Sequence, residues 1–199
     1  MWAILKKWRF LILACTAVVI LAWIFNFLDP LFARWYEKRK ALADLSTPNW
    51  RRFTNNECGY VVEFPSKPFE NPNTLTNHQN VVSYHQFAAA LERDQVFMIG
   101  TLITSITNNY SDEQTELLLD TAAKTPLKEG GQLLSERKIK LGTNPGKEVE
   151  ITMANGNFAR MRFYQVGHDL QEVIVTVPFA DRQSTNISYF MDSFNTVSK

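Results

Sequence analysis

Residues 147–166 carry the sequence KEVEITMANGNFARMRFYQV, and this stretch predicts a β-hairpin. Apolar and charged residues alternate on both sides of residues 154–156, as they do in strands that bury one face. A three-residue loop, here Ala-Asn-Gly with the glycine supplying the positive φ, is a common hairpin turn. This turn sets which residues face each other, and the predicted apolar pairs are Val149 with Met161 and Ile151 with Ala159.

The charged residues of the hairpin form two further predicted pairs, Glu148 with Arg162 and Glu150 with Arg160. A two-residue loop would instead place Val149 opposite Arg162, and register follows the apolar pattern. Opposite charges that face each other across two strands stabilise a sheet. We therefore interpret the two glutamates as members of exposed structural pairs rather than as paired catalytic acids.

Further strands are predicted on both sides of the hairpin, at residues 60–64, 81–91, 95–105, 133–141 and 170–177. Residues 60–64 and 133–141 alternate between apolar and polar positions, and residues 81–91 and 95–105 are strand-like segments joined by a polar turn. Pro65 ends the first of them. The predicted turns are at residues 92–94, 142–146 and 167–169, and residues 65–80, which are rich in proline and asparagine, predict a loop.

Two helices complete the predicted domain. Ser111, with Gln114 three residues later, is a capping box that predicts a helix start, and Pro126 marks its predicted end. Four apolar residues close to the C-terminus recur at helical spacing, namely Ile187, Phe190, Met191 and Phe194. Strands, a helix, a four-strand meander and a closing helix together predict an α+β fold, in which helices cover an antiparallel sheet.

Residues 10–28, FLILACTAVVILAWIFNFL, form a run of 19 residues without a charge and predict one transmembrane helix before the domain. A helix of about 20 apolar residues spans the hydrocarbon core of a bilayer. A cleaved signal peptide is the main alternative, but its apolar region is usually about 7–15 residues long and ends at a small-residue cleavage site, which this run lacks. A lipoprotein signal at Cys15 is disfavoured because the apolar run continues well beyond that cysteine.

Aromatic and basic residues flank the predicted anchor. Tryptophan and tyrosine concentrate at membrane interfaces, and basic residues attract anionic headgroups. The residues expected at the interface are Trp8, Trp35, Tyr36, Lys38, Arg39 and Lys40. Near the far end of the run, Trp23, Asn26 and Phe27 are candidate contacts to a partner helix, since polar side chains often hydrogen-bond between membrane helices. The alternative is that Asn26 lies close enough to the interface to be hydrated.

The chain therefore divides into an N-terminal tail with the transmembrane anchor (1–29), an amphipathic juxtamembrane helix with a linker (30–49), and a soluble α+β domain (50–199). The juxtamembrane helix either lies in the membrane interface or continues the anchor as a solvated stalk, and the sequence favours neither. Three basic residues precede the anchor and four follow it, so the positive-inside rule does not decide which end of the anchor faces the cytoplasm. The short N-terminal tail favours N-in insertion, which places the domain outside the cytoplasm.

Composition and motifs limit the chemistry that the domain can perform. Residues 50–199 hold 14 lysines and arginines against 17 acidic residues, a net charge of −3, which argues against nucleic acid as a partner. The three histidines, His78, His85 and His168, lack metal-ligand spacing, and the chain has no G-x-S-x-G nucleophile elbow. Cys58 is the one cysteine of the domain, so no disulfide forms within it. The sequence predicts no catalytic residue, no cofactor and no metal.

Residues 59–65 (GYVVEFP), 142–148 (GTNPGKE) and 189–194 (YFMDSF) lie at the start, in the middle and at the end of the predicted domain. These stretches and the order of elements resemble the PsbP-like sandwich family, which includes the photosynthetic PsbP proteins and DcrB-like bacterial envelope proteins. The resemblance implies an antiparallel α-β sandwich and a non-enzymatic module that binds, or helps to assemble, a larger membrane complex. It transfers no functional residue.

We therefore expect a single-pass membrane-anchored, non-enzymatic interaction or assembly subunit, whose partners are membrane lipid and an integral membrane protein complex. One alternative is a tethered domain for a small apolar or lipid ligand, which needs an internal cavity between sheet and helix. Another is an enzyme of an unrecognised type, which needs a pocket with convergent polar groups.

We predict that the mature protein keeps its N-terminus, because a long apolar run without a cleavage site acts as an anchor rather than as a signal peptide. N-terminal sequencing of the protein purified from membranes should therefore begin at or next to Met1. A first residue close to positions 29–36 would contradict the prediction.

Overall fold

The computed structural model describes residues 48–71, 81–91, 94–105 and 110–197. Most of the strands belong to one antiparallel sheet. They are β3 (Phe69–Asn71), β4 (Val81–Leu91), β5 (Gln95–Thr104), β6 (Gln132–Leu141), β7 (Asn144–Thr152), β8 (Phe158–Val166) and β9 (Asp169–Val177). This seven-stranded sheet has the order β3-β4-β5-β9-β8-β7-β6, so the predicted four-strand meander, β6 to β9, is confirmed as one half of the sheet.

A smaller antiparallel sheet contains β1 (Arg51–Asn55), β2 (Tyr60–Phe64) and β10 (Asn195–Thr196), in the order β1-β2-β10. The helical elements of the described residues are α2 (Asp112–Lys128), the short 3-10 helix η1 (Phe179–Asp181) and α3 (Thr185–Ser193). The architecture is therefore α+β with antiparallel strands, as the sequence predicts, but the prediction was of one sheet and the described residues form two.

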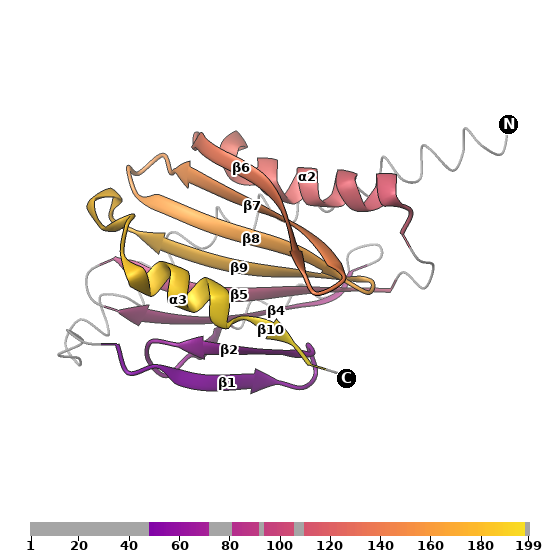
Figure 1. Cartoon of the computed structure of the whole chain (residues 1–199), viewed down its shortest axis with the longest axis horizontal. Coiled ribbons are helices and arrows are strands. Elements are labelled where there is room, and N and C mark those ends of the chain that lie inside the picture. The colour runs from indigo at the N-terminus through magenta and orange to yellow at the C-terminus, as the bar shows by residue number, and fades with distance from the viewer. Residues whose placement is uncertain (1–47, 72–80, 92–93, 106–109, 198–199) are drawn as a thin grey trace, which may run out of the picture.

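The two faces of the large sheet are covered by different elements (Figure 1). On one face, α2 contributes Leu119, Ala122 and Ala123 to a core that includes Val149 and Met161 of the central hairpin. On the other face, α3 and the small sheet build a second core, with aromatic side chains from Phe64, Phe97 and Phe190 among its members. The domain is thus a layered sandwich in which the large sheet is the central layer.

The predicted hairpin register is confirmed. Val149 faces Met161, Ile151 faces Ala159, and Glu148 faces Arg162. The loop at residues 154–156 is closed by a hydrogen bond from the Met153 amide to the Asn157 carbonyl at 2.7 Å. Its glycine has a φ of 83°, which is the left-handed conformation that the loop requires.

Helix α2 begins as predicted but continues past Pro126. The Ser111 hydroxyl accepts from the Gln114 amide, and the Gln114 side chain accepts from the Ser111 amide, which is the predicted capping box. The predicted end at Pro126 is wrong, since the helix extends to Lys128. A proline in the last turn removes a single helical hydrogen bond, and Pro126 is buried in the folded domain.

The predicted turn at residues 142–146 is also too long. The strands β6 and β7 are paired as far as Leu141 and Asn144, which face each other. The turn itself is therefore Gly142-Thr143, with a φ of 60° at the glycine. Gly146 is a strand residue instead. A Cβ atom at Gly146 would lie 2.5 Å from the Tyr164 ring, so this glycine is needed for close packing within the sheet and not for a turn.

Three short strands were not predicted. The strand β1 precedes the first predicted strand, β3 lies within the segment predicted as a loop, and β10 follows the helix predicted to close the chain. All three are edge strands of 2 to 5 residues. Such short strands have little pattern of their own and depend on hydrogen bonds to a neighbouring strand.

The predicted transmembrane helix, residues 10–28, and the juxtamembrane helix lie outside the described residues. In the described part of the chain, no helix combines the length and apolar character that are needed to cross a bilayer.

Candidate functional site

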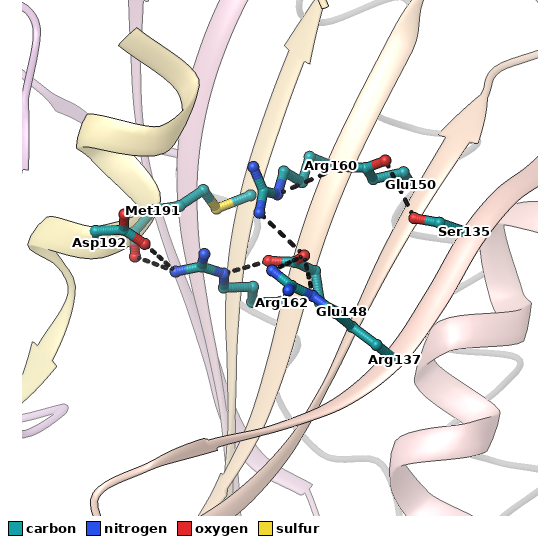
Figure 2. Close-up of polar contacts among 8 residues, drawn as sticks. All are labelled: Ser135, Arg137, Glu148, Glu150, Arg160, Arg162, Met191 and Asp192. Carbon is teal, nitrogen blue, oxygen red and sulfur yellow. Dashed lines mark hydrogen bonds and ion pairs between the residues drawn. The ribbon is translucent and has the colours of Figure 1, made fainter. Parts of the chain in front are cut away.

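The most extensive polar cluster surrounds Glu148, whose side chain is only 3% exposed. Its oxygens accept hydrogen bonds from Arg137 Nε at 2.8 Å, Arg160 Nη2 at 3.0 Å and Arg162 Nε at 2.5 Å. Arg137 lies on β6 and the other two arginines lie on β8, on either side of β7. One carboxylate therefore bridges three neighbouring strands (Figure 2).

Arg162 extends this cluster to α3. Its Nη1 donates to the Met191 carbonyl and to Asp192 Oδ1, both at 2.8 Å. Met191 lies in the last turn of the helix, where backbone carbonyls have no donor within the helix. Figure 2 shows the guanidinium between the helix end and Glu148, so Arg162 both caps α3 and attaches it to the sheet.

The predicted pair Glu148–Arg162 is confirmed, but its predicted exposure is wrong. Burial by itself raises the pKa of Glu148, and hydrogen bonds from Arg162 and Arg160 outweigh that effect and hold the pKa below its ordinary value. The carboxylate lies among Arg137, Arg160 and Arg162, the last of which also binds the end of α3. Glu150 is more exposed and lies 3.6 Å from Arg160 Nε, so only this second predicted pair approaches the loose surface contact that was expected.

Lys147 directly precedes Glu148 and points to the opposite face, where its side chain is 6% exposed. Its Nζ binds Asp120 of α2 and lies 2.9 Å from Glu136 of β6 and 3.6 Å from Glu116 of α2. Burial lowers the pKa of Lys147, but the hydrogen bonds to Asp120 and Glu136 dominate and raise it to about 12. This cluster attaches α2 to the sheet as the Glu148 cluster attaches α3.

A third buried charge site, at Glu172 of β9, has few partners. The Tyr84 hydroxyl donates to its Oε2 at 3.1 Å, and its buried Oε1 makes no hydrogen bond with any described residue. Gly100 provides the space, because a Cβ atom there would lie 2.5 Å from the Tyr84 hydroxyl and 2.8 Å from Glu172 Oε2. Burial raises the pKa of Glu172 to about 7, although the hydrogen bond from Tyr84 acts to lower it.

A pocket of about 190 Å³ opens between the hairpin and the start of α3. Arg160 and Glu150 line it on the side of the sheet, and Leu134 lines it from β6. Arg182 and Ser184 line it from the loop that leads into α3. The pocket therefore borders the Glu148 cluster, and its lining contains two cationic side chains, one carboxylate and apolar side chains.

The residues that the sequence predicts at the membrane all lie outside the described part of the chain. They are Trp8, Trp35, Tyr36, Lys38, Arg39 and Lys40 at the interface and Trp23, Asn26 and Phe27 at the partner contact, and these assignments stay predictions. His78 is also outside that part. His85 lies 3.7 Å from both Glu57 and Glu70, and within the described residues no group of three or more histidine, cysteine or acidic side chains is arranged to hold a metal ion.

Sequence reasoning missed Arg137, Asp192 and Arg182. The place of Arg137 opposite Glu148 follows from the β6–β7 register, which a two-residue turn at Gly142-Thr143 would have predicted. Asp192 lies 30 residues from its partner Arg162 in the chain, and Arg182 lies more than 20 residues from Arg160, so no local pattern indicates that they come together.

The fold is a PsbP-like α-β sandwich. The structure is similar to the solution structure of cyanobacterial PsbP (CyanoP) from Synechocystis sp. PCC 6803, with a TM-score of 0.54 over 78% of this chain and 95% of that chain, at 11% sequence identity. It also matches LpqN, which is involved in cell envelope biogenesis of Mycobacterium tuberculosis, with a TM-score of 0.40 over 78% of this chain and 83% of that chain, at 11% identity. No family model and no curated protein sequence matches the chain. At such low identity the likeness to CyanoP shows the fold alone, and it confirms the resemblance drawn from the sequence.

We predict that Glu148→Gln destabilises the domain by about 3 kcal/mol, because breaking a buried ion pair leaves buried charge without compensation. The matched variant Glu150→Gln removes the same charge two residues away on the same face, and we expect a change within about 0.5 kcal/mol. Urea unfolding of both variants at pH 7 measures the difference. Equal effects of the two substitutions would contradict the assignment of Glu148 as the central group.

We predict that Glu172 makes the domain less stable as the pH rises. Its pKa is about 7 in the folded state against 4.5 ordinarily, so between these values the folded state binds the proton that the unfolded state has released. The free energy of unfolding should therefore fall by about 2–3 kcal/mol from pH 5 to pH 8 on account of this group. Glu172→Gln should remove that slope in urea unfolding measured across the pH range. Parallel pH profiles of the variant and the wild type would refute the prediction.

Proposed function

We propose that this protein is a single-pass membrane-anchored, non-enzymatic interaction or assembly subunit of a larger membrane protein complex. The observation that carries the proposal is the combination, in one chain, of an uncharged run of 19 residues and a PsbP-like sandwich. The run is long enough to hold the chain in a bilayer. The domain then lies next to the membrane, on the extracytoplasmic side.

The roles of the buried charged groups support interaction over catalysis. The groups around Glu148 and Lys147 contact one another and fasten α3 and α2 to the sheet. A catalytic site needs such groups to converge on a cavity where a substrate can bind. In this domain their hydrogen bonds join the two helices to the sheet, and Arg160 also lines the pocket. This arrangement favours a rigid module that presents its surface to partners.

The alternative of a small apolar ligand receives less support. The pocket beside α3 has Arg160, Arg182 and Glu150 among its lining residues, and burying an apolar molecule against these groups would remove water from their charges without replacing it. The pocket favours a polar or anionic group instead.

Exchange of the anchor tests the proposal. We expect the wild-type protein, purified in a mild detergent, to bring integral membrane proteins with it, identified by mass spectrometry. Replacing residues 10–28 with an unrelated spanning helix of equal length should leave the protein in the membrane but reduce the yield of those partners, because polar and aromatic groups of the native run then no longer contact them.

A pair of point variants refines this experiment. Asn26→Leu removes the amide that is predicted to hydrogen-bond to a partner helix, a contact worth about 0.6 kcal/mol on average. Thr16→Val is the matched control, since it also removes a polar group from the run. An unchanged yield after the anchor exchange would assign the binding to the domain, and a wild-type protein that purifies without partners would overturn the proposed function.

A further inference from the structure

The edge of the large sheet next to the pocket is open. Within the described sheet, β6 pairs with β7 on one side only. The first seven residues of β6 are exposed, and Leu134, which is 48% exposed, also lines the pocket. An exposed edge strand has unpaired backbone donors and acceptors that can bind another strand. A chain that paired with β6 would therefore run past the mouth of the pocket.

The two arginines of the pocket are held in place by the fold. Arg160 donates to Glu148 at 3.0 Å, and its buried Nε has no hydrogen-bond acceptor among the described residues. The guanidinium of Arg182 packs 4.5 Å above the Phe179 ring and donates to the Phe179 carbonyl at 3.2 Å. A guanidinium has five N–H donors, so both groups keep donors that these contacts do not use. The pocket lining has two guanidinium groups but one carboxylate, that of Glu150, which lies 3.6 Å from Arg160.

The charges of β6 select among the chains that could pair with it. The strand has three basic residues, Arg137, Lys138 and Lys140, and one acidic residue, Glu136. Three of them already have partners within the domain, since Arg137 binds Glu148, Lys138 lies 2.9 Å from Glu116 and Glu136 lies 2.9 Å from Lys147, and the strand keeps a basic excess. Like charges that face each other weaken strand pairing, and basic residues on an edge guard against self-association. A second copy of β6 is therefore a poor partner, whereas an acidic strand matches both the edge and the pocket.

We propose that β6 and the adjoining pocket bind an extended acidic segment of a partner protein, which pairs with β6 and inserts one carboxylate between Arg160 and Arg182. The inference rests on the proposed assembly function and names the kind of partner contact that the domain makes. In strand addition, backbone hydrogen bonds supply affinity and a side pocket supplies specificity. A chain-terminal carboxylate and an acidic side chain present the same chemistry to the two arginines.

Peptide binding to the full-length protein in detergent tests the inference. The probe is a fluorescein-labelled decapeptide of alternating glutamate and valine, and fluorescence anisotropy measures its affinity. We expect the peptide to bind, and we expect N-methylation of every second residue to weaken it by about tenfold or more, since this removes hydrogen bonds to the strand edge. A decapeptide of alternating lysine and valine should bind as weakly as the N-methylated peptide. Amidation of the C-terminus distinguishes the two carboxylate sources, because only a terminal carboxylate is lost with it.

Two charge-matched variants locate the binding site. Arg182→Gln removes a pocket guanidinium that lies outside the Glu148 cluster, and we expect about a tenfold loss of affinity, the equivalent of one charge-assisted hydrogen bond. Arg51→Gln removes the same charge from an exposed position on β1 and should leave the affinity unchanged. Equal losses in the two variants, tight binding of the N-methylated peptide, or no binding of the acidic peptide would each overturn the inference. Retained co-purification of membrane partners in Arg182→Gln would then show that the assembly function stands without this site.

Discussion

The structure depends on two adjacent residues of β7 that carry opposite charges and point in opposite directions. Successive side chains of a strand alternate between its faces, so Lys147 contacts α2 through Asp120 while Glu148 reaches α3 through Arg162. Both helices are thereby attached to the sheet at one level of one strand. A shift of β7 by one residue would bring Lys147 among the arginines and Glu148 among the carboxylates. The charges of these two residues therefore favour the same register as the apolar pattern does.

Such clusters contribute more to specificity than to net stability. Moving a charge out of water costs several kcal/mol. The attraction between buried partners offsets this desolvation penalty only when the remaining donors and acceptors are also hydrogen-bonded. Glu148 meets that condition with three guanidinium groups, and Arg162 meets it by also binding the last turn of α3. An apolar pair at the same place would allow α3 to slide along the sheet. The ionic cluster holds the C-terminal end of α3 at one position on the sheet.

Local patterns predicted much of this fold, and contacts between distant segments account for what they missed. The hairpin register and the capping box at Ser111 depend on residues close in sequence, so both were predictable. The burial of Glu148 was not, because it depends on folding: Arg162, one of its partners, also binds Asp192, which lies 30 residues further along the chain. Gly146 looked like a turn residue, yet the Tyr164 ring is the reason for it. The pocket joins β6, the hairpin and the approach to α3, and no single stretch of sequence contains it.

The two most buried carboxylates of the domain show how partners rather than burial decide the charge of a group. Glu148 and Glu172 lie on opposite faces of the same sheet, and burial acts on both to raise the pKa. Hydrogen bonds from the Arg162 and Arg160 guanidinium groups reverse that effect at Glu148, whereas one hydroxyl group from Tyr84 does not reverse it at Glu172. The first carboxylate stays charged and joins the adjacent strands β6, β7 and β8, and its partner Arg162 attaches α3. The second changes its charge near neutral pH inside the central strands, where Gly100 leaves room for nothing larger than the existing pair. The part of the sheet that borders the pocket is thus held by permanent charges, and this suits a surface that must keep its shape while a partner binds.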